Sequence, residues 1–210
     1  MNFENAKIID ISPLLQENIA VFPGDTEYTR KEALSFEQGH NLRLSSINAT
    51  LHLGAHTDAP SHYHRDGITM EKRKLDLYMG DCQVIEVKSP KGERVRPEHL
   101  QTEINSPRVL LKTNSFPNPN QWNNDFNALS KSLVESLVKK GVKLIGIDTP
   151  SVDLADDKEL ECHNLIYEND LAILEGIILN HVEPGHYQLI ALPLNLQGAD
   201  ASPVRAILIK

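Results

Sequence analysis

The sequence predicts an α/β protein built around one large mixed sheet. Many short apolar runs alternate with turn signals, whereas only two segments carry a helical pattern. Strands and helices follow one another in mixed order, which is typical of an α/β or α+β domain. The chain has no internal repeat, low-complexity tract or linker. We therefore expect residues 1–210 to form a single domain of ordinary size.

The first half of the chain is expected to supply mainly strands and turns. Residues 7–13 read KIIDISP, which predicts a strand ended by a proline turn, and Pro-Gly-Asp within residues 21–26 predicts a tight turn. Partly alternating residues rich in Leu, Ile, Ser and Thr predict a strand over 42–53. Further strands are predicted over 82–88 and 108–112.

The second half begins with a loop and the clearest helix. Residues 114–127 are rich in asparagine and proline, which predicts a long loop of the kind that often carries function. A helix is predicted over 131–140, with Ser130 or Ser132 as its N-cap and Gly141 as its end. Another helix is expected from about 157 to 167. The remaining segments are strand-like and comprise 142–148, 171–179, 187–196 and 203–210.

Composition excludes several classes of partner. The net charge of −8 argues against nucleic acid and anionic membranes, because both require a basic surface. Two distant cysteines, Cys82 and Cys162, form no disulfide framework and favour a reducing compartment. The N-terminal residues lack the pattern of a secretory signal, and the longest apolar run, 171–179, is too short to span a bilayer. We therefore expect a soluble cytoplasmic protein.

One stretch stands out for its histidines. Residues 51–64 read LHLGAHTDAPSHYH, so four of the nine histidines and an aspartate fall within fourteen residues. A helix is not expected here, because Gly54 lies between the first two histidines and Pro60 follows closely. The alternatives are a loop of solvated histidines, a single core histidine with incidental neighbours, or a metal site.

A strand through this stretch would favour the metal site. Side chains alternate along a strand, so His52, Gly54, His56 and Asp58 are expected to share one face, with Gly54 leaving open space between the two imidazoles. Two neutral imidazoles and one carboxylate are the ligands that an open zinc site requires.

The next two histidines are expected to differ from these. His62 follows the turn at Pro60 and could swing back toward the same point as a proton shuttle rather than a ligand. His64 breaks the alternation, which favours a role outside the site.

Two distant residues are candidates for completing a second site. Glu175 lies inside an apolar run, where a carboxylate is costly unless it is paired or bound to metal. His163 follows a predicted helix start. The alternatives are an ion pair of Glu175 with Arg205 or Arg108, and a satisfied core histidine at position 163.

Three more residues near these elements are assigned structural roles. Asp148 and Asp153 follow a predicted buried strand, where carboxylates serve either chemistry or turns and helix caps, and we favour the turn or cap. Cys162 is expected to be a small buried apolar residue.

The stretch HLGAHTDAPSH resembles the H-x-G-x-H-x-D-x-P-x-H signature of the metal-dependent cyclase family, which includes kynurenine formamidases and isatin hydrolases. The likeness extends from about residue 8 to 209, because DISPLL, VFPGDT, LIGIDTPSVD, ILEGIIL, YQLIALPLNL and DASPVRA resemble family blocks in the same order. The resemblance implies a swivelling β/β/α-type fold, a homodimer and two divalent ions per subunit. Those ions would be Zn²⁺, with Mn²⁺ or another divalent ion as the alternative.

The resemblance also implies a role for each candidate residue. The first ion would be bound by His52, His56 and Asp58, and the second by Asp58, His163 and Glu175, with Glu175 also reaching the first; His62 would be the general acid/base, and Phe22 would contact the substrate ring. The implied partner is a small aryl formamide, and the implied reaction converts N-formyl-L-kynurenine and water to L-kynurenine and formate through a metal-bound hydroxide, in tryptophan degradation. The alternatives are hydrolysis of another cyclic amide or lactone such as isatin, and a non-catalytic metal-binding module.

Overall fold

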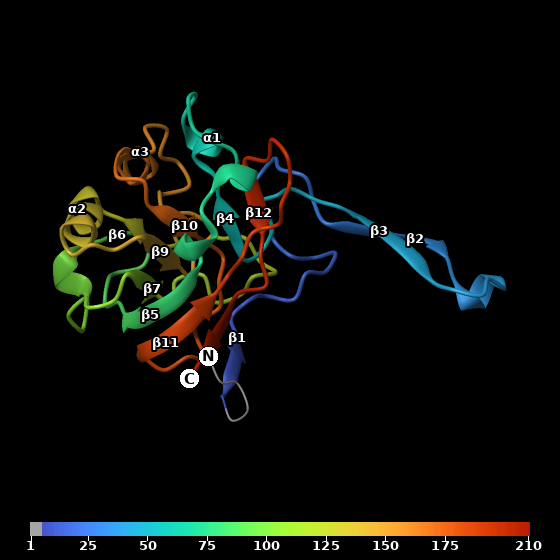
Figure 1. The fold of residues 1–210 in the computed structure, drawn as a ribbon, viewed down its shortest axis with the longest axis horizontal. Coiled ribbons are helices and arrows are strands. Elements are labelled where there is room, and N and C mark those ends of the chain that lie inside the picture. Colours follow the sequence, from blue (N-terminus) through green and yellow to red (C-terminus); the bar gives the residue numbers. More distant parts are fainter. Residues whose placement is uncertain (1–5) are drawn as a thin grey trace.

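A seven-stranded mixed sheet forms the centre of the molecule in the computed structural model, which describes residues 6–210 (Figure 1). In spatial order the sheet contains β1 (Ile8–Asp10), β13 (Ile207–Ile209), β11 (Gly185–Ile190), β5 (Met79–Glu86), β7 (Arg108–Lys112), β9 (Leu144–Ile147) and β10 (Ala172–Leu174). Strands β5, β7, β9 and β10 are parallel, whereas β11, β13 and β1 pair in antiparallel fashion. The predicted α/β class with one large mixed sheet is confirmed.

Both faces of the sheet are buried, because its central strands are apolar on both sides. In β7, Leu110 packs into one core cluster, whereas Val109 and Leu111 pack into another. Strand β9 divides in the same way, with Leu144 on the first face and Ile145 on the second. Continuous apolar runs of this kind are typical of parallel strands that are covered on both sides.

Two helices cover the second face (Figure 1). They are α2 (Lys131–Lys139) and α3 (Glu161–Glu168). Ser130 caps α2 by accepting a hydrogen bond from the Leu133 backbone N–H, so the first of the two proposed caps is correct. The other helical elements that the structure describes are one short helix, α1 (Pro60–Tyr63), and the 3-10 turns Phe36–Gln38, Met70–Lys72, Leu75–Leu77 and Pro97–His99. Among residues 6–210, no helix is long and apolar enough to cross a membrane.

Within the described part of the chain, three pairs of strands lie outside the main sheet. Strands β4 (His56–Asp58) and β12 (Ala201–Pro203) pair in antiparallel fashion, and β6 (Arg94–Val95) pairs with β8 (Ala128–Leu129) in parallel. A hairpin of β2 (Thr29–Leu34) and β3 (Leu44–Asn48) projects from the body as an arm (Figure 1).

The predicted elements are largely found, but several bounds are wrong. The strand predicted over 42–53 ends at Asn48, because residues 49–55 bend toward the body. The second helix begins at Glu161 rather than near 157, after turns at residues 155–156. Of the apolar run 171–179, only residues 172–174 pair in the sheet.

Candidate metal centre

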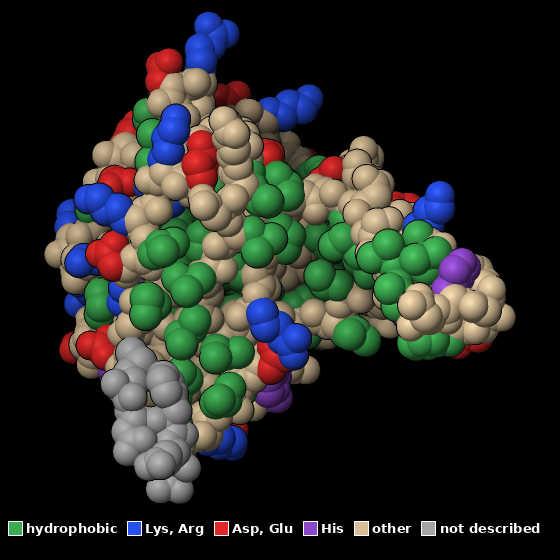
Figure 2. Space-filling model, turned by 45° about the vertical axis from the view of Figure 1, so that its right-hand side comes forward, with side chains coloured by type: hydrophobic (Ala, Val, Ile, Leu, Met, Phe, Trp, Pro, Cys, Tyr) green, Lys and Arg blue, Asp and Glu red, His purple; other side chains and the backbone are tan. Residues whose placement is uncertain are grey.

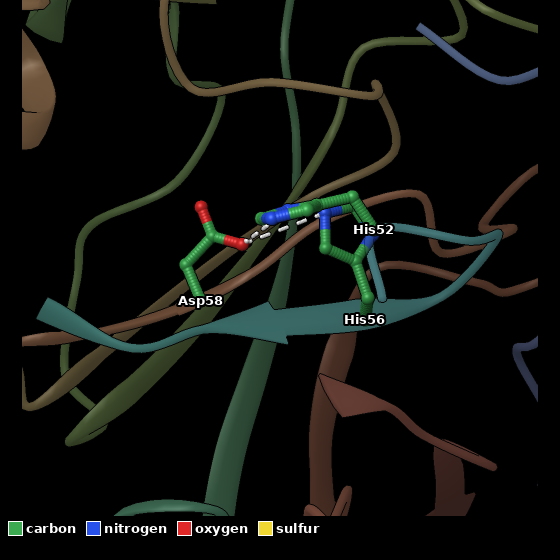
Figure 3. Close-up of side chains that lie close together, drawn as sticks. All are labelled: His52, His56 and Asp58. Atoms are coloured by element: carbon green, nitrogen blue, oxygen red, sulfur yellow. Dashed lines mark ion pairs between the residues drawn. The ribbon is translucent and has the colours of Figure 1, made fainter. Parts of the chain in front are cut away.

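The first group of candidate ligands gathers at strand β4. His56 and Asp58 are two residues apart on this strand, so their side chains share one face, as Figure 3 shows. His52 reaches the same place from the bend before the strand. Its Nδ1 lies 3.0 Å from Asp58 Oδ1, and His56 Nε2 lies 3.6 Å from the same oxygen. The three side chains predicted to lie together are therefore brought together.

The predicted cause of this convergence, alternation of side chains along one strand with open space at Gly54, is partly wrong. Gly54 has φ +57°, in the left-handed region, so the segment from His52 to Asp58 is not one continuous strand. Nor does Gly54 leave open space for an ion. A Cβ at this position would lie 2.8 Å from the Leu15 side chain and 3.0 Å from Pro13. The glycine allows the tight bend that delivers His52 to the cluster.

A second group of candidate ligands continues from the other side of Asp58. His163 Nε2 lies 3.6 Å from Asp58 Oδ2 and 4.0 Å from Glu175 Oε1. Glu175 Oε2 lies 3.2 Å from His56 Nε2, so this carboxylate lies between the two groups. The predicted ligands from more than a hundred residues downstream therefore join the histidine-rich stretch in space.

Backbone pairing holds Glu175 in this position. The backbone N–H of His56 donates to the Glu175 carbonyl, and the N–H of Glu175 donates to the His56 carbonyl. The adjacent Gly176 permits the approach, because a Cβ there would fall 2.1 Å from the Gly54 carbonyl oxygen. Neither arginine proposed as a partner of Glu175 pairs with it. Arg205 pairs with Asp10, and Arg108 donates to backbone carbonyls.

Each candidate imidazole ligand has a partner at its far nitrogen. His56 Nδ1 lies 2.8 Å from the Gly54 carbonyl, and His163 Nδ1 lies 2.8 Å from Asp153 Oδ2. His52 Nε2 lies 3.2 Å from Asp200 Oδ2. Such partners fix which ring nitrogen carries the proton and leave the other nitrogen available to a metal.

Asp153 is therefore more than the turn or cap residue that the sequence favours. It is fully buried and also accepts hydrogen bonds from the backbone N–H groups of Cys162 and His163. Arg94 Nη1 donates to its other oxygen at 2.9 Å. Asp148 does have a structural role, because it accepts hydrogen bonds from the backbone N–H groups of Thr113 and Asn114. Cys162 is buried, as expected.

The clustered charges raise the pKa values of two histidines and lower the pKa of the aspartate between them. Burial would lower the pKa of His52, but pairing with the Asp58 carboxylate outweighs burial and raises it to about 9. Burial is likewise outweighed at His163, where Asp153 and then Asp58 raise the pKa to about 10. Burial would raise the pKa of Asp58, yet the neighbouring histidines hold it well below its usual range. The cluster thus favours an ionised carboxylate beside positive charge.

The geometry of this cluster fits a divalent ion. Ligands at 2.0–2.2 Å from a tetrahedral zinc ion lie roughly 3.3–3.6 Å from one another, and the shorter contacts of His52, His56 and His163 with the two carboxylates, at 3.0–3.6 Å, are close to that separation. Within residues 6–210, Asp58 Oδ1 is a buried oxygen that has two imidazole nitrogens within 3.6 Å but receives no hydrogen bond of good geometry from either. An unsatisfied buried carboxylate oxygen is costly, and a cation would satisfy it.

His62 lies at the exposed side of the cluster. It belongs to α1, where Pro60 turns the chain, and its ring centroid is 4.1 Å from that of His52. Its side chain is 38% exposed, whereas those of His56 and His163 are buried. The His62 ring therefore lies beside the cluster, and its role in proton transfer stays a prediction. His64 points elsewhere and stacks on Tyr167, with centroids 3.8 Å apart.

A cavity of about 470 Å³ leads to the cluster. Its outer wall is aromatic: Phe22 lies edge-on to Trp122 at 5.1 Å between centroids, and Phe116 also lines the cavity. Phe116 and Trp122 belong to the predicted 114–127 loop. The sequence did not single out these two aromatic residues or Asp200. The one available signal was Trp122, the only tryptophan of the chain, within a long loop.

Fold and site together define a class of protein: an α/β protein whose cavity ends at imidazoles and carboxylates suited to a divalent metal. The family follows from comparison with known proteins. Residues 9–154 match the family model described as "Putative cyclase", and the chain belongs to this cyclase family.

The chain is similar to named members of several kinds. It is 42% identical over 204 residues to a kynurenine formamidase of Delftia acidovorans (strain DSM 14801 / SPH-1), covering 96% of this chain and 97% of that protein. A solved structure of a potential metal-dependent hydrolase with cyclase activity superposes with a TM-score of 0.83 at 25% identity, covering 97% and 98% of the two chains. Isatin hydrolase A from Labrenzia aggregata shares the fold, with a TM-score of 0.83, 18% identity and coverage of 97% and 93%.

Proposed function

We propose that this chain is a metal-dependent amide hydrolase that converts N-formyl-L-kynurenine and water to L-kynurenine and formate. The observation that carries this proposal is the convergence of three imidazoles and two carboxylates beneath an aromatic cavity. The 42% identity to a kynurenine formamidase over nearly the whole chain supports this substrate within the family.

We assign the ligands as the resemblance implies. His52, His56 and Asp58 would hold one ion, and Asp58, His163 and Glu175 a second, because each set places its donor atoms within 4.8 Å of one another. Nitrogen and oxygen donors without a thiolate suit Zn²⁺, and Mn²⁺ is the main alternative. When bound, such ions supply Lewis acidity that activates water at neutral pH and polarises a carbonyl.

The side chains around the cluster position the substrate and move the proton. Phe22 and Trp122 form an edge-to-face pair against which the aryl ring of a formamide can pack. In hydrolysis, water adds its oxygen to the formyl carbon, the carbon–nitrogen bond breaks, and the arylamine nitrogen must gain a proton. His62 lines the cavity and is partly exposed, so its imidazole takes the proton from water and delivers it to that nitrogen.

The decisive experiment pairs metal analysis with an assay on two substrates. Protein purified without added metal should contain a divalent ion and hydrolyse N-formylkynurenine faster than isatin. The reverse preference would assign the chain to a cyclic amide, and bound metal without turnover of either would make it a binding module.

A substitution tests the role of His62 directly. His62→Ala should retain its metal but lose about 10²–10⁴-fold in turnover, the usual contribution of general acid–base catalysis. His64→Ala is the matched control, because that ring stacks on Tyr167 outside the cluster and should keep wild-type turnover. Metal loss in His62→Ala would make His62 a ligand.

We also propose a homodimer, on the basis of the β2–β3 arm. Phe36, Leu42, Leu44 and Ile47 of this arm are all more than 40% exposed. Figure 2 shows apolar side chains gathered on the arm and on the adjoining face of the body. A two-stranded hairpin is at best marginally stable alone, and large apolar patches mark interaction sites. Sedimentation should give a dimer, and Ile47→Glu should shift it toward monomer.

A cytoplasmic location remains part of the proposal. It is supported by Cys82 and Cys162, which are buried free thiols. Cell fractionation with an antibody against the chain would test it, and recovery in an oxidising compartment would contradict it.

A further inference from the structure

The two ligand sets proposed above, His52–His56–Asp58 and Asp58–His163–Glu175, are called the inner sets here. A third group of candidate ligands lies on their solvent side. It consists of His52, His62 and Asp200, whose donor atoms also lie within 4.8 Å of one another. Asp200 Oδ2 lies 3.2 Å from His52 Nε2 and 3.6 Å from His62 Nδ1. Asp200 precedes β12, and pairing of β12 with β4 holds it here, since the Ala59 N–H donates to the Asp200 carbonyl.

The distances from Asp200 Oδ2 to the two imidazole nitrogens are similar to the distances between ligands of one zinc ion. Two ligands of a tetrahedral zinc ion lie roughly 3.3–3.6 Å apart, which is close to both contacts of Asp200 Oδ2. The Asp200 and His62 side chains are 49% and 38% exposed, so an ion can reach them from solvent. Two imidazoles and one carboxylate leave a fourth position for water.

We propose that His52, His62 and Asp200 form an outer, inhibitory site for a divalent cation such as Zn²⁺. The site is distinct from the two inner sets but shares His52 with the first. His52 presents Nδ1 to Asp58 and Nε2 to Asp200, so one ring faces both sites. An outer ion bound to Nε2 displaces the proton of that nitrogen into solvent, and the imidazole then bridges two ions.

The outer site should be weaker than the inner sites. It has a single, half-exposed carboxylate, whereas the inner sets use the buried carboxylates of Asp58 and Glu175. A cation in the outer site is also repelled by the inner cations a few ångströms away. It should therefore fill only when zinc exceeds what the inner sites need.

Filling the outer site should stop the reaction. When the outer ion is bound to Nδ1 of His62, the one proton that remains on this ring is on Nε2. The imidazole then has no free nitrogen that can accept a proton from water. This consequence rests on the proposed function, whereas binding of the ion does not. Excess zinc should lower turnover without displacing the inner ions.

The test is to titrate the zinc-loaded enzyme with further Zn²⁺. Bound zinc is followed by equilibrium dialysis and turnover by the formamidase assay. We expect wild type to take up one further zinc per subunit and to lose at least nine-tenths of its turnover over the same concentration range. Asp200→Asn should shift both midpoints upward by at least tenfold, whatever its rate at low zinc.

Asp25→Asn is the matched control, because Asp25 is another exposed carboxylate lining the same cavity. It should keep both wild-type midpoints. The proposal is overturned if wild type binds no further zinc, or if Asp200→Asn retains the wild-type midpoints. Lack of formamidase activity at every zinc concentration would instead refute the proposed function, since dialysis still reports the outer site.

Discussion

Replacing Asp153 by asparagine tests whether a buried carboxylate outside the ligand set controls the metal centre. The change is isosteric but removes the charge beside His163 Nδ1, 2.8 Å away. One oxygen of Asp153 accepts from the ring and backbone of His163, the other accepts from Arg94, and the backbone N–H of Cys162 is shared between the two. An amide keeps one acceptor, so one of these two sets of donors loses its partner.

The magnitude follows from those contacts. Loss of a carboxylate that orients a metal-binding histidine typically weakens metal affinity 10–100-fold, or about 1.4–2.8 kcal/mol. The orphaned donors cost a further ~1–3 kcal/mol of folding stability, because Asp153 is fully buried. We therefore expect Asp153→Asn to weaken zinc binding and to lower the unfolding midpoint of the metal-free protein.

Chelator competition measures the first effect, and urea unfolding of the metal-free protein measures the second. Asp148→Asn provides the matched control, since Asp148 is also buried and accepts several hydrogen bonds but holds the start of the 114–127 loop. It should lose comparable stability and keep wild-type zinc affinity. Equal zinc affinities in Asp153→Asn and wild type would refute the role that we assign to Asp153.

Three further predictions concern the centre and its surroundings. Chelation of the metal should lower the thermal midpoint, and either Zn²⁺ or Mn²⁺ should restore it, because a ligand that binds only the folded state stabilises it. Trp122→Ala should raise the KM for N-formylkynurenine several-fold by removing an edge-to-face partner of Phe22, with metal content unchanged in elemental analysis. Gly54→Ala should cost about 1–3 kcal/mol in urea unfolding, since its φ is +57° and the Cβ would meet Leu15, and wild-type stability would contradict this.

In the candidate metal centre, the sequence predicts contacts between residues that are close in the chain better than contacts between distant residues. His56 and Asp58 share a face because they are two residues apart on a strand, and this spacing is visible in the sequence. His163 and Glu175 could be proposed as partners from an apolar context and a family pattern, but Glu175 reaches the centre through the pairing of residue 175 with residue 56, and His163 is held there by Asp153. The convergence of His52 was predicted for an incorrect reason, since it depends on a bend at Gly54 rather than on alternation.

Features set by long-range packing could not be predicted. Residues 29–34 read TRKEAL, which lacks strand alternation, and they form β2 only by pairing with β3. Asp200 reaches His52 because β12 pairs with β4 across more than 140 residues. Nothing in the local sequence around either element specifies these partners.

The partners of the three imidazole ligands differ in a way that separates the inner and outer sides of the centre. The far nitrogens of His56 and His163 are held by a backbone carbonyl and by a fully buried carboxylate, so neither ring can turn without breaking its hydrogen bond. His52 is held by the half-exposed Asp200, which water or a cation can displace. The same Asp200 oxygen lies beside His62. His52, the ligand that is held least firmly, and His62, the proposed acid/base, therefore share one exposed partner. The side of the centre formed by His56 and His163 is therefore rigid. Changes in the solvent, such as a higher cation concentration, affect the reaction through Asp200.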